Sequence, residues 1–188
     1  MADVDIRPFK TQHLPQLPNV ITGYVTQESY IVEKQELDEF VLFSLRLSPL
    51  PIPKTIAYNH LDEEELARIA EIVAASLSLG AFVAGELVGV ALASAESWNR
   101  SLRVWEFHVA EPWRGQGIGR RLMDRLVETA VQQNLRIIVC ETQSCNVPAI
   151  RAYRKLGFVL DGIDLSFYSN EDVQTDNVAI FMKRYLTG

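Results

Sequence analysis

The stretch from Leu102 to Arg121, LRVWEFHVAEPWRGQGIGRR, constrains the fold of this chain more than any other. Residues 102–109 alternate between two faces, which is typical of a β-strand. The alternation places on one face Leu102, Val104, Glu106 and His108, and on the other Arg103, Trp105, Phe107 and Val109. Pro112 ends the expected strand because proline has no N–H to donate to a sheet. Apolar residues then recur at helical spacing from Ile118 onward. The sequence therefore predicts a strand, a glycine-rich turn and an amphipathic helix in direct succession.

The glycine-rich turn has the features of a phosphate-binding loop. Unpaired N–H groups and the positive end of the helix dipole attract anions there, and glycines let a ligand approach the backbone. A Walker loop is excluded because no Lys-Ser/Thr pair follows, and the dinucleotide fingerprint fails because Arg120 occupies its last glycine position. The spacing that fits is Arg-x-x-Gly-x-Gly, made by Arg114, Gly117 and Gly119. An ordinary glycine-containing connection is the alternative interpretation.

This spacing resembles the acetyl-CoA pyrophosphate loop of the GNAT superfamily of N-acetyltransferases. The downstream order strengthens the resemblance, because an expected strand over 135–142 is followed by Asn146, a short helix, Tyr153 and the pair Gly157-Phe158. Asn146 is also a plausible N-cap for that helix, and Gly157 a plausible residue after its end. The phrase ETQSCNVPAIRAYRKLGF resembles the streptothricin acetyltransferase branch in particular.

The resemblance implies an α/β fold with a GNAT-like mixed, mainly antiparallel central sheet and helices on both faces. The strands over 102–109 and 135–142 would be the splayed parallel pair that admits the cofactor. We expect a single N-acetyltransferase domain over 1–188, with the resemblance clearest over 79–184 and a less typical part over 1–60. The order of expected strands and helices by itself predicts a mixed sheet with helices on both faces.

The remaining elements follow from local patterns. Three prolines at 49, 51 and 53 predict an extended linker, and Asp62 with Glu65 predicts a helix N-terminus. Gly85 predicts the turn of a hairpin. The other expected elements are a loop over 11–19, a hairpin of 30–36 and 40–47 turning at 36–39, strands at 79–84 and 86–94, and closing strands at 158–169 and 178–185.

Composition excludes several classes of function. The chain has 188 residues, of which 48% are hydrophobic, and its net charge is −6. A basic surface is typical of nucleic-acid binding, so we expect no nucleic-acid partner. The two cysteines, Cys140 and Cys145, have no metal-ligand spacing, and no metal is expected. No apolar run is long enough for a membrane span or a signal peptide, which predicts a cytoplasmic protein with no membrane partner.

Acetyl transfer to an amine needs a base for the amine proton, a donor to the oxyanion and an acid for the thiolate. The resemblance places the acid at Tyr153 and the oxyanion donor at the backbone of Val109. Glu106 is our first choice of base and His108, whose side chain type titrates near neutrality, the second. Glu141 is a weaker third candidate. Each of these side chains could instead make an ordinary structural hydrogen bond.

Acetyl-CoA is the co-substrate that the resemblance implies. Arg121 beside the loop could add a cation or could simply be solvated. The residues expected to bind acetyl-CoA are Phe107, His108, Val109, Arg114, Gly115, Gln116, Gly117, Ile118, Gly119, Arg120, Asn146 and Tyr153.

The expected acceptor is a primary amine of a small molecule, with a streptothricin-like compound as one option. A protein or peptide N-acetyltransferase and a non-catalytic acyl-CoA-binding module are the alternatives. Homodimers are frequent in the resembled family, which makes a homodimer an option here. A cationic amine could be held by cation–π contact or ion pairing. Candidates for this role are Trp98, Tyr30, Tyr58, Asp161 and Asp164.

Overall fold

The structure is a computed structural model that describes residues 3–58, 61–75 and 77–186. These residues fall into two compact units. The first unit contains the chain up to Thr22, then Ala57–Cys140, and the C-terminal residues from Arg184. The second unit contains Gly23–Ile56 and Glu141–Lys183. The expected phosphate loop and central strand belong to the first unit, whereas Asn146 and Tyr153 belong to the second.

The first unit is built on a mixed sheet. Neighbouring strands follow the order β1-β4-β5-β6-β7. The first four strands pair antiparallel, and β6 pairs parallel with β7 where Ser101–Val104 lie opposite Ile137–Cys140. The predicted mainly antiparallel sheet with one parallel strand pair is confirmed. The strands are β1 (Asp5–Pro8), β4 (Leu79–Val83), β5 (Glu86–Glu96), β6 (Ser101–Val109) and β7 (Ile137–Gln143).

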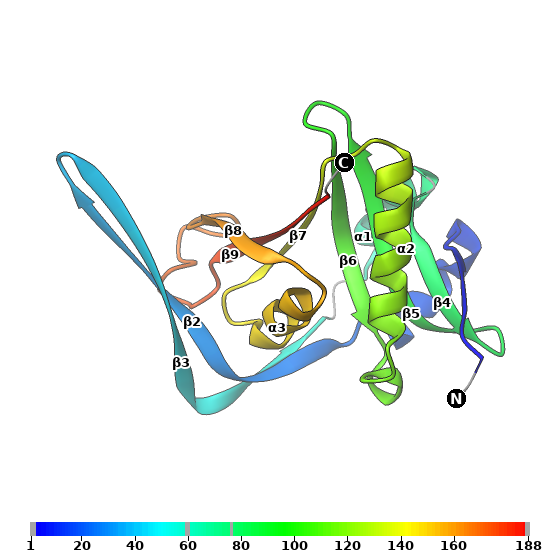
Figure 1. Ribbon diagram of the computed structural model, residues 1–188. Helices are drawn as coiled ribbons and strands as arrows, with labels where there is room; N and C mark the ends of the chain where they lie inside the picture. The colour runs from blue at the N-terminus through cyan, green and yellow to red at the C-terminus, as the bar shows by residue number, and fades with distance from the viewer. Residues whose placement is uncertain (1–2, 59–60, 76, 187–188) are drawn as a thin grey trace. The chain divides into compact units, whose positions relative to one another are not determined.

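Helices lie against this sheet (Figure 1). They bury its apolar side chains. The 3-10 helix η1 (Thr11–Asn19) and α1 (Glu63–Ala74) form one core cluster with β5, and α2 (Ile118–Gln132) forms another with β4 and β5. Leu122 of α2 is fully buried, and a side chain of this size contributes about 1.5–3 kcal/mol when it leaves water. The Asp62 carboxylate accepts a hydrogen bond from the Glu65 N–H at 2.9 Å, which confirms the predicted start of α1.

The second unit combines a hairpin, a helix and the end of the sheet order. The helix α3 (Val147–Lys155) packs against β2 (Gly23–Leu37), which forms a two-stranded sheet with β3 (Phe40–Ala57). Strand β8 (Val159–Asp164) pairs antiparallel with β9 (Ala179–Tyr185), and the end of β7 follows β9 in the strand order. Gly157 has a φ of 88°, a left-handed conformation that glycine adopts easily, so the predicted end of α3 is confirmed.

Two sequence predictions of irregular segments, the linker and the loop, were wrong. Residues 49–53 are not a linker, because β3 continues through all three prolines to Ala57. Prolines at alternate positions occupy the same edge of a strand, so they leave the hydrogen bonds on the other edge intact. Residues 11–19 form η1 and not a loop, since their prolines are compatible with a 3-10 helix. None of the described helices has the length and apolar character needed to cross a membrane.

Candidate functional site

The glycine-rich loop joins β6 to α2 in the way that the sequence predicts. A short 3-10 turn, η2 (Glu111–Trp113), ends the strand, and Gly117 is the N-cap of α2. Gly115 and Gly117 have φ values of 76° and 83°, which L-residues rarely adopt. Both glycines are exposed, and a Cβ built at either would meet no atom within 4 Å. The loop therefore offers open backbone at a helix N-terminus, as a bound phosphate requires.

Side chains from the loop fix its shape. The Arg114 Nε donates to the Val109 carbonyl oxygen at 2.9 Å, and the Gln116 side-chain amide donates to the Pro112 carbonyl at 3.0 Å. Arg114 thereby holds the loop against the end of β6. The guanidinium is exposed, and this bond uses only one of its five N–H donors.

The first turn of α2 divides its residues between the core and the loop. Ile118 is buried against Leu122, so any contact it makes with a ligand comes from its backbone N–H. A Cβ at Gly119 would lie 3.6 Å from the Phe107 ring, an ordinary contact. Arg121 donates to the Val4 carbonyl at 2.8 Å, which gives it a structural role.

The two candidate bases on β6 are in direct contact. The Glu106 Oε2 lies 2.7 Å from the His108 Nε2, and the two side chains are 18% and 16% exposed. The ring of Tyr58 meets the His108 ring edge-on, with centroids 5.8 Å apart. When the neutral imidazole of His108 donates its Nε2–H to the Glu106 carboxylate, its Nδ1 carries no proton and can act as an acceptor. The arrangement can take up a proton through either member of the pair.

A β-bulge at Trp105 changes the faces that simple alternation predicts. Val104 lies opposite Ala93 and Glu106 opposite Leu92, so Trp105 is the extra residue on β6. Alternation placed Trp105 on the face of Phe107 and Val109, and this prediction was wrong. The Trp105 ring instead lies 5.6 Å from the guanidinium of Arg68, a residue of α1.

Arg68 is a feature of this region that sequence analysis missed. Hydrogen bonds to the Glu65 carboxylate raise the pKa of Arg68 against the opposing effect of burial, and the nearby charge of Glu106 raises it further. Arg68 is thus a permanent cation close to the Glu106–His108 pair. The available signal was the Glu65–Arg68 spacing of three on a predicted helix, which indicates an ion pair but not its position beside the sheet.

Tyr153 and Asn146 lie together in the second unit. The Asn146 side-chain oxygen accepts a hydrogen bond from the Ala149 N–H at 3.2 Å, which confirms its predicted capping role. Tyr153 is 7% exposed, and its ring lies 5.6 Å from that of Phe158. Both observations fit a packed tyrosine, and neither tests its expected role as an acid.

Several other candidates already have structural partners. Asp161 forms an ion pair with Lys183 at 2.6 Å, and Asp164 accepts a hydrogen bond from the Ser166 N–H at 3.0 Å. The Glu141 carboxylate accepts a hydrogen bond from the Tyr168 hydroxyl. The Tyr30 ring lies 5.8 Å from the Arg154 guanidinium. Of the predicted substrate residues, Trp98 is 82% exposed and Tyr58 contacts the candidate base pair.

The sequence matches a known family of enzymes. The family model for the Acetyltransferase (GNAT) family matches residues 41–158, which is more than half of the sequence. This chain therefore belongs to the GNAT acetyltransferase family.

Among curated relatives, streptothricin acetyltransferase from Streptomyces lavendulae is 38% identical over 84 residues, covering 45% of this chain and 44% of that protein. Streptothricin acetyltransferase from Escherichia coli is 34% identical over 106 residues, covering 56% and 60%. The matched stretches thus span less than two thirds of these relatives.

Solved structures extend the similarity of fold over nearly the whole chain. Nourseothricin acetyltransferase has a TM-score of 0.75 at 25% identity, with 98% of this chain and 99% of that chain covered. A proposed streptothricin acetyltransferase from Bacillus anthracis, in complex with acetyl coenzyme A, has a TM-score of 0.74 at 21% identity and covers 99% of both chains.

Proposed function

We propose that this protein transfers the acetyl group of acetyl-CoA to a primary amine of a small molecule, with a streptothricin-like amine as the first candidate. The observation that carries the proposal is the Glu106–His108 pair, 2.7 Å apart on the strand that leads into the glycine-rich start of α2. A proton acceptor and a phosphate-binding backbone on one strand–loop–helix segment are two requirements of this reaction.

The loop supports the binding of the CoA pyrophosphate. The open backbone at Gly115 and Gly117 offers N–H donors, and Arg114 adds a cation held in place by the Val109 carbonyl. Gln116, Gly119 and Arg120 extend this proposed set, as do Phe107, Ile118 and Asn146. Acetyl-CoA itself supplies the thioester whose carbonyl carbon is attacked.

In the proposed reaction the Glu106–His108 pair accepts the proton of the attacking amine. The amine nitrogen then bonds to the thioester carbon, and the backbone N–H of Val109 donates to the oxyanion. The carbon–sulfur bond breaks, and Tyr153 protonates the departing thiolate. The products are an amide and the free CoA thiol. The Glu106–His108 pair then carries an extra proton and Tyr153 lacks one, until each group exchanges protons with solvent.

A panel of amines tests the proposal most directly. Purified protein is mixed with acetyl-CoA and either a streptothricin, a simple diamine, lysine or a peptide with a free N-terminus, and released CoA thiol is measured. We expect release with small amines and an acetylated product one acetyl group heavier by mass spectrometry. Turnover of the peptide alone would favour a protein acetyltransferase.

The same protein preparation also distinguishes an enzyme from a non-catalytic acyl-CoA-binding module. Calorimetry with CoA would show binding in both cases, whereas only an enzyme releases thiol in the presence of an acceptor. Binding of CoA without release of thiol in the presence of any amine would contradict the proposed reaction. It would still support the proposed role of the loop in binding acyl-CoA. The cytoplasmic location and the homodimer of the family remain predictions that these experiments do not address.

A further inference from the structure

The hairpin of β2 and β3 forms a sheet of only two strands within the part of the chain that the structure describes. It extends away from α3, β8 and β9 of its own unit (Figure 1). Isolated two-stranded sheets are marginally stable in water, and an open strand edge is a template for another strand. The far half of this hairpin exposes the large apolar side chains of Leu37, Phe40, Val41, Leu42, Phe43 and Leu47.

The two-residue turn at Asp38 and Glu39 determines which edge of β3 is open. In such a hairpin the flanking residues, Leu37 and Phe40, form a hydrogen-bonded pair. Even-numbered residues of β3 then direct their N–H groups toward β2, and odd-numbered residues direct theirs outward. The Ser44 hydroxyl lies 3.5 Å from the Glu33 carboxylate, as this register requires.

The prolines of β3 define the length of the open edge. Pro49, Pro51 and Pro53 are all odd-numbered, so in this register they lie on the outer edge and remove its N–H donors at these three positions. Donors remain on this edge from residue 39 to residue 47. Nine residues lie within the usual length of strands in folded proteins, about 3–10 residues.

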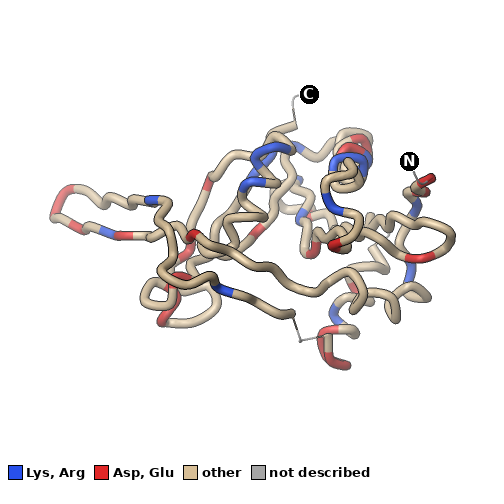
Figure 2. Tube along the Cα trace, turned by 90° about the horizontal axis from the view of Figure 1, so that it is seen from below, with Lys and Arg blue, Asp and Glu red and all other residues tan. Residues whose placement is uncertain are grey.

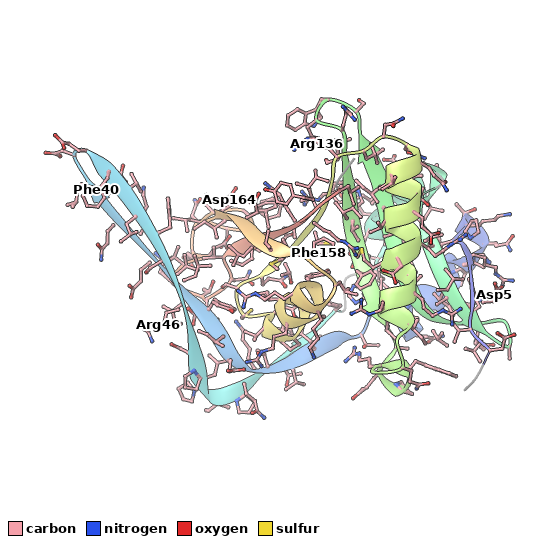
Figure 3. All side chains as sticks on the ribbon, in the orientation of Figure 1. Asp5, Phe40, Arg46, Arg136, Phe158 and Asp164 are labelled. Atoms are coloured by element: carbon pink, nitrogen blue, oxygen red, sulfur yellow. The ribbon has the colours of Figure 1, made fainter. Side chains whose placement is uncertain are left out.

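The charges on this edge are arranged for self-pairing. Asp38 and Glu39 lie at the turn, where Figure 2 shows acidic residues gathered, and Arg46 lies at the other end of the apolar run. Figure 3 shows Phe40 at the tip of the hairpin and Arg46 further along the arm. An antiparallel copy of the same edge brings each basic end to an acidic end, whereas a parallel copy would oppose like charges.

We propose that the outer edge of β3 pairs antiparallel with the same edge of a second copy of this chain, with the two-fold axis at Leu42. The outward N–H groups of both copies belong to odd-numbered residues. In an antiparallel pair an odd-numbered residue therefore faces an odd-numbered residue of the second copy, and an even-numbered residue faces an even-numbered one. Centring on Leu42 places Asp38 opposite Arg46 in a non-hydrogen-bonded pair, where side chains are closest. Val41 and Phe43 then exchange backbone hydrogen bonds. The result is a closed, isologous dimer with a four-stranded sheet.

The first test compares two proline variants on the full chain by sedimentation equilibrium. The wild type should show twice the 21.2 kDa mass of one chain over about 1–100 µM. Phe43→Pro removes an outward donor inside the pairing stretch and should give the monomer mass. Leu47→Pro is the matched control, because its outward N–H has no opposing strand in this register, and it should remain dimeric.

The second test uses charge and does not alter the backbone. Asp38→Arg and Arg46→Asp each oppose like charges twice in the symmetric dimer, and each should weaken its Kd at least tenfold. The double variant restores opposite charges and should recover the wild-type Kd. These masses are measured without acetyl-CoA or an acceptor, so the outcome is independent of the proposed reaction.

A wild type that is still monomeric at about 100 µM would overturn the proposal. A dimer that survives Phe43→Pro would also overturn it, as would a double charge variant no tighter than the single variants. Circular dichroism of each variant confirms that the strands are retained.

Discussion

Glu106 and His108 should behave in catalysis as one unit and not as two independent groups. Their polar atoms are 2.7 Å apart, a distance typical of a charge-assisted hydrogen bond, and less than a fifth of each side chain is exposed. A substitution of either member therefore removes a hydrogen-bond partner of the other. The test is a set of three variants: Glu106→Gln, His108→Gln and the double variant.

The expected magnitudes follow from the value of a general base. Loss of a positioned base lowers kcat/KM by about 100-fold or more, which corresponds to about 2.7 kcal/mol. If the pair is one unit, each single variant loses about this much and the double variant loses no more than the worse single one. If the two groups were independent, their fold-losses in kcat/KM would multiply, and the double variant would lose about 10,000-fold, or about 5.4 kcal/mol.

The assay is kcat/KM for the best amine, measured by thiol release across a pH series, with melting curves to confirm the fold. Rates of all three variants should recover partly at high pH, where the amine loses its proton in solution. If only Glu106→Gln removes the acidic limb of the profile, Glu106 is the base, and the converse result would assign the role to His108. Multiplicative losses, or unchanged profiles in all three variants, would refute the reasoning.

The remaining predictions concern the acid, the loop and a buried histidine. Tyr153→Phe should lower kcat about 100-fold with little change in KM, whereas a purely structural tyrosine would lower the melting temperature and leave kcat near normal. Gly117→Asn keeps a residue that tolerates positive φ but fills open space, and calorimetry should show CoA affinity about tenfold weaker, while the matched control Gly85→Asn, at a hairpin turn with a similar positive φ and open space, binds normally. Burial and two nearby cations lower the pKa of His13 in the folded state, so the unfolded chain binds more protons below about pH 6.5. The melting temperature should therefore fall more between about pH 7.5 and pH 5.5 in the wild type than in His13→Gln, and equal falls would contradict this.

The sequence predicted those parts of the fold that depend on neighbouring residues. Asp62 and Asn146 begin their helices because a short polar side chain can reach an N–H three residues later. Gly85 makes a hairpin turn and Gly157 ends α3, since both adopt positive φ at little cost. The loop at Gly117 follows the same rule. In each case the determining contact spans only a few residues, so the local sequence is sufficient.

Residues 49–53 show why other parts could not be predicted. Proline excludes a helix and removes a donor, and these local effects alone favour a linker. Whether a strand can continue through prolines depends on which edge its partner occupies, and that partner, β2, is set by the hairpin turn at residues 38 and 39. The spacing of two was visible in the sequence, but its meaning required the register of the hairpin.

The β-bulge at Trp105 explains why alternation predicted the shared face of Glu106 and His108 correctly and the face of Trp105 wrongly. A bulge adds one residue to a strand, so alternation holds on either side of it and fails across it. Glu106 and His108 both follow the bulge, and they share a face as alternation requires. Trp105 is the bulged residue, and its ring lies near Arg68 of α1, whose pKa also responds to Glu106. Because the bulge arises from how β5 pairs with β6, no pattern within β6 alone could have shown that this cation lies near Glu106.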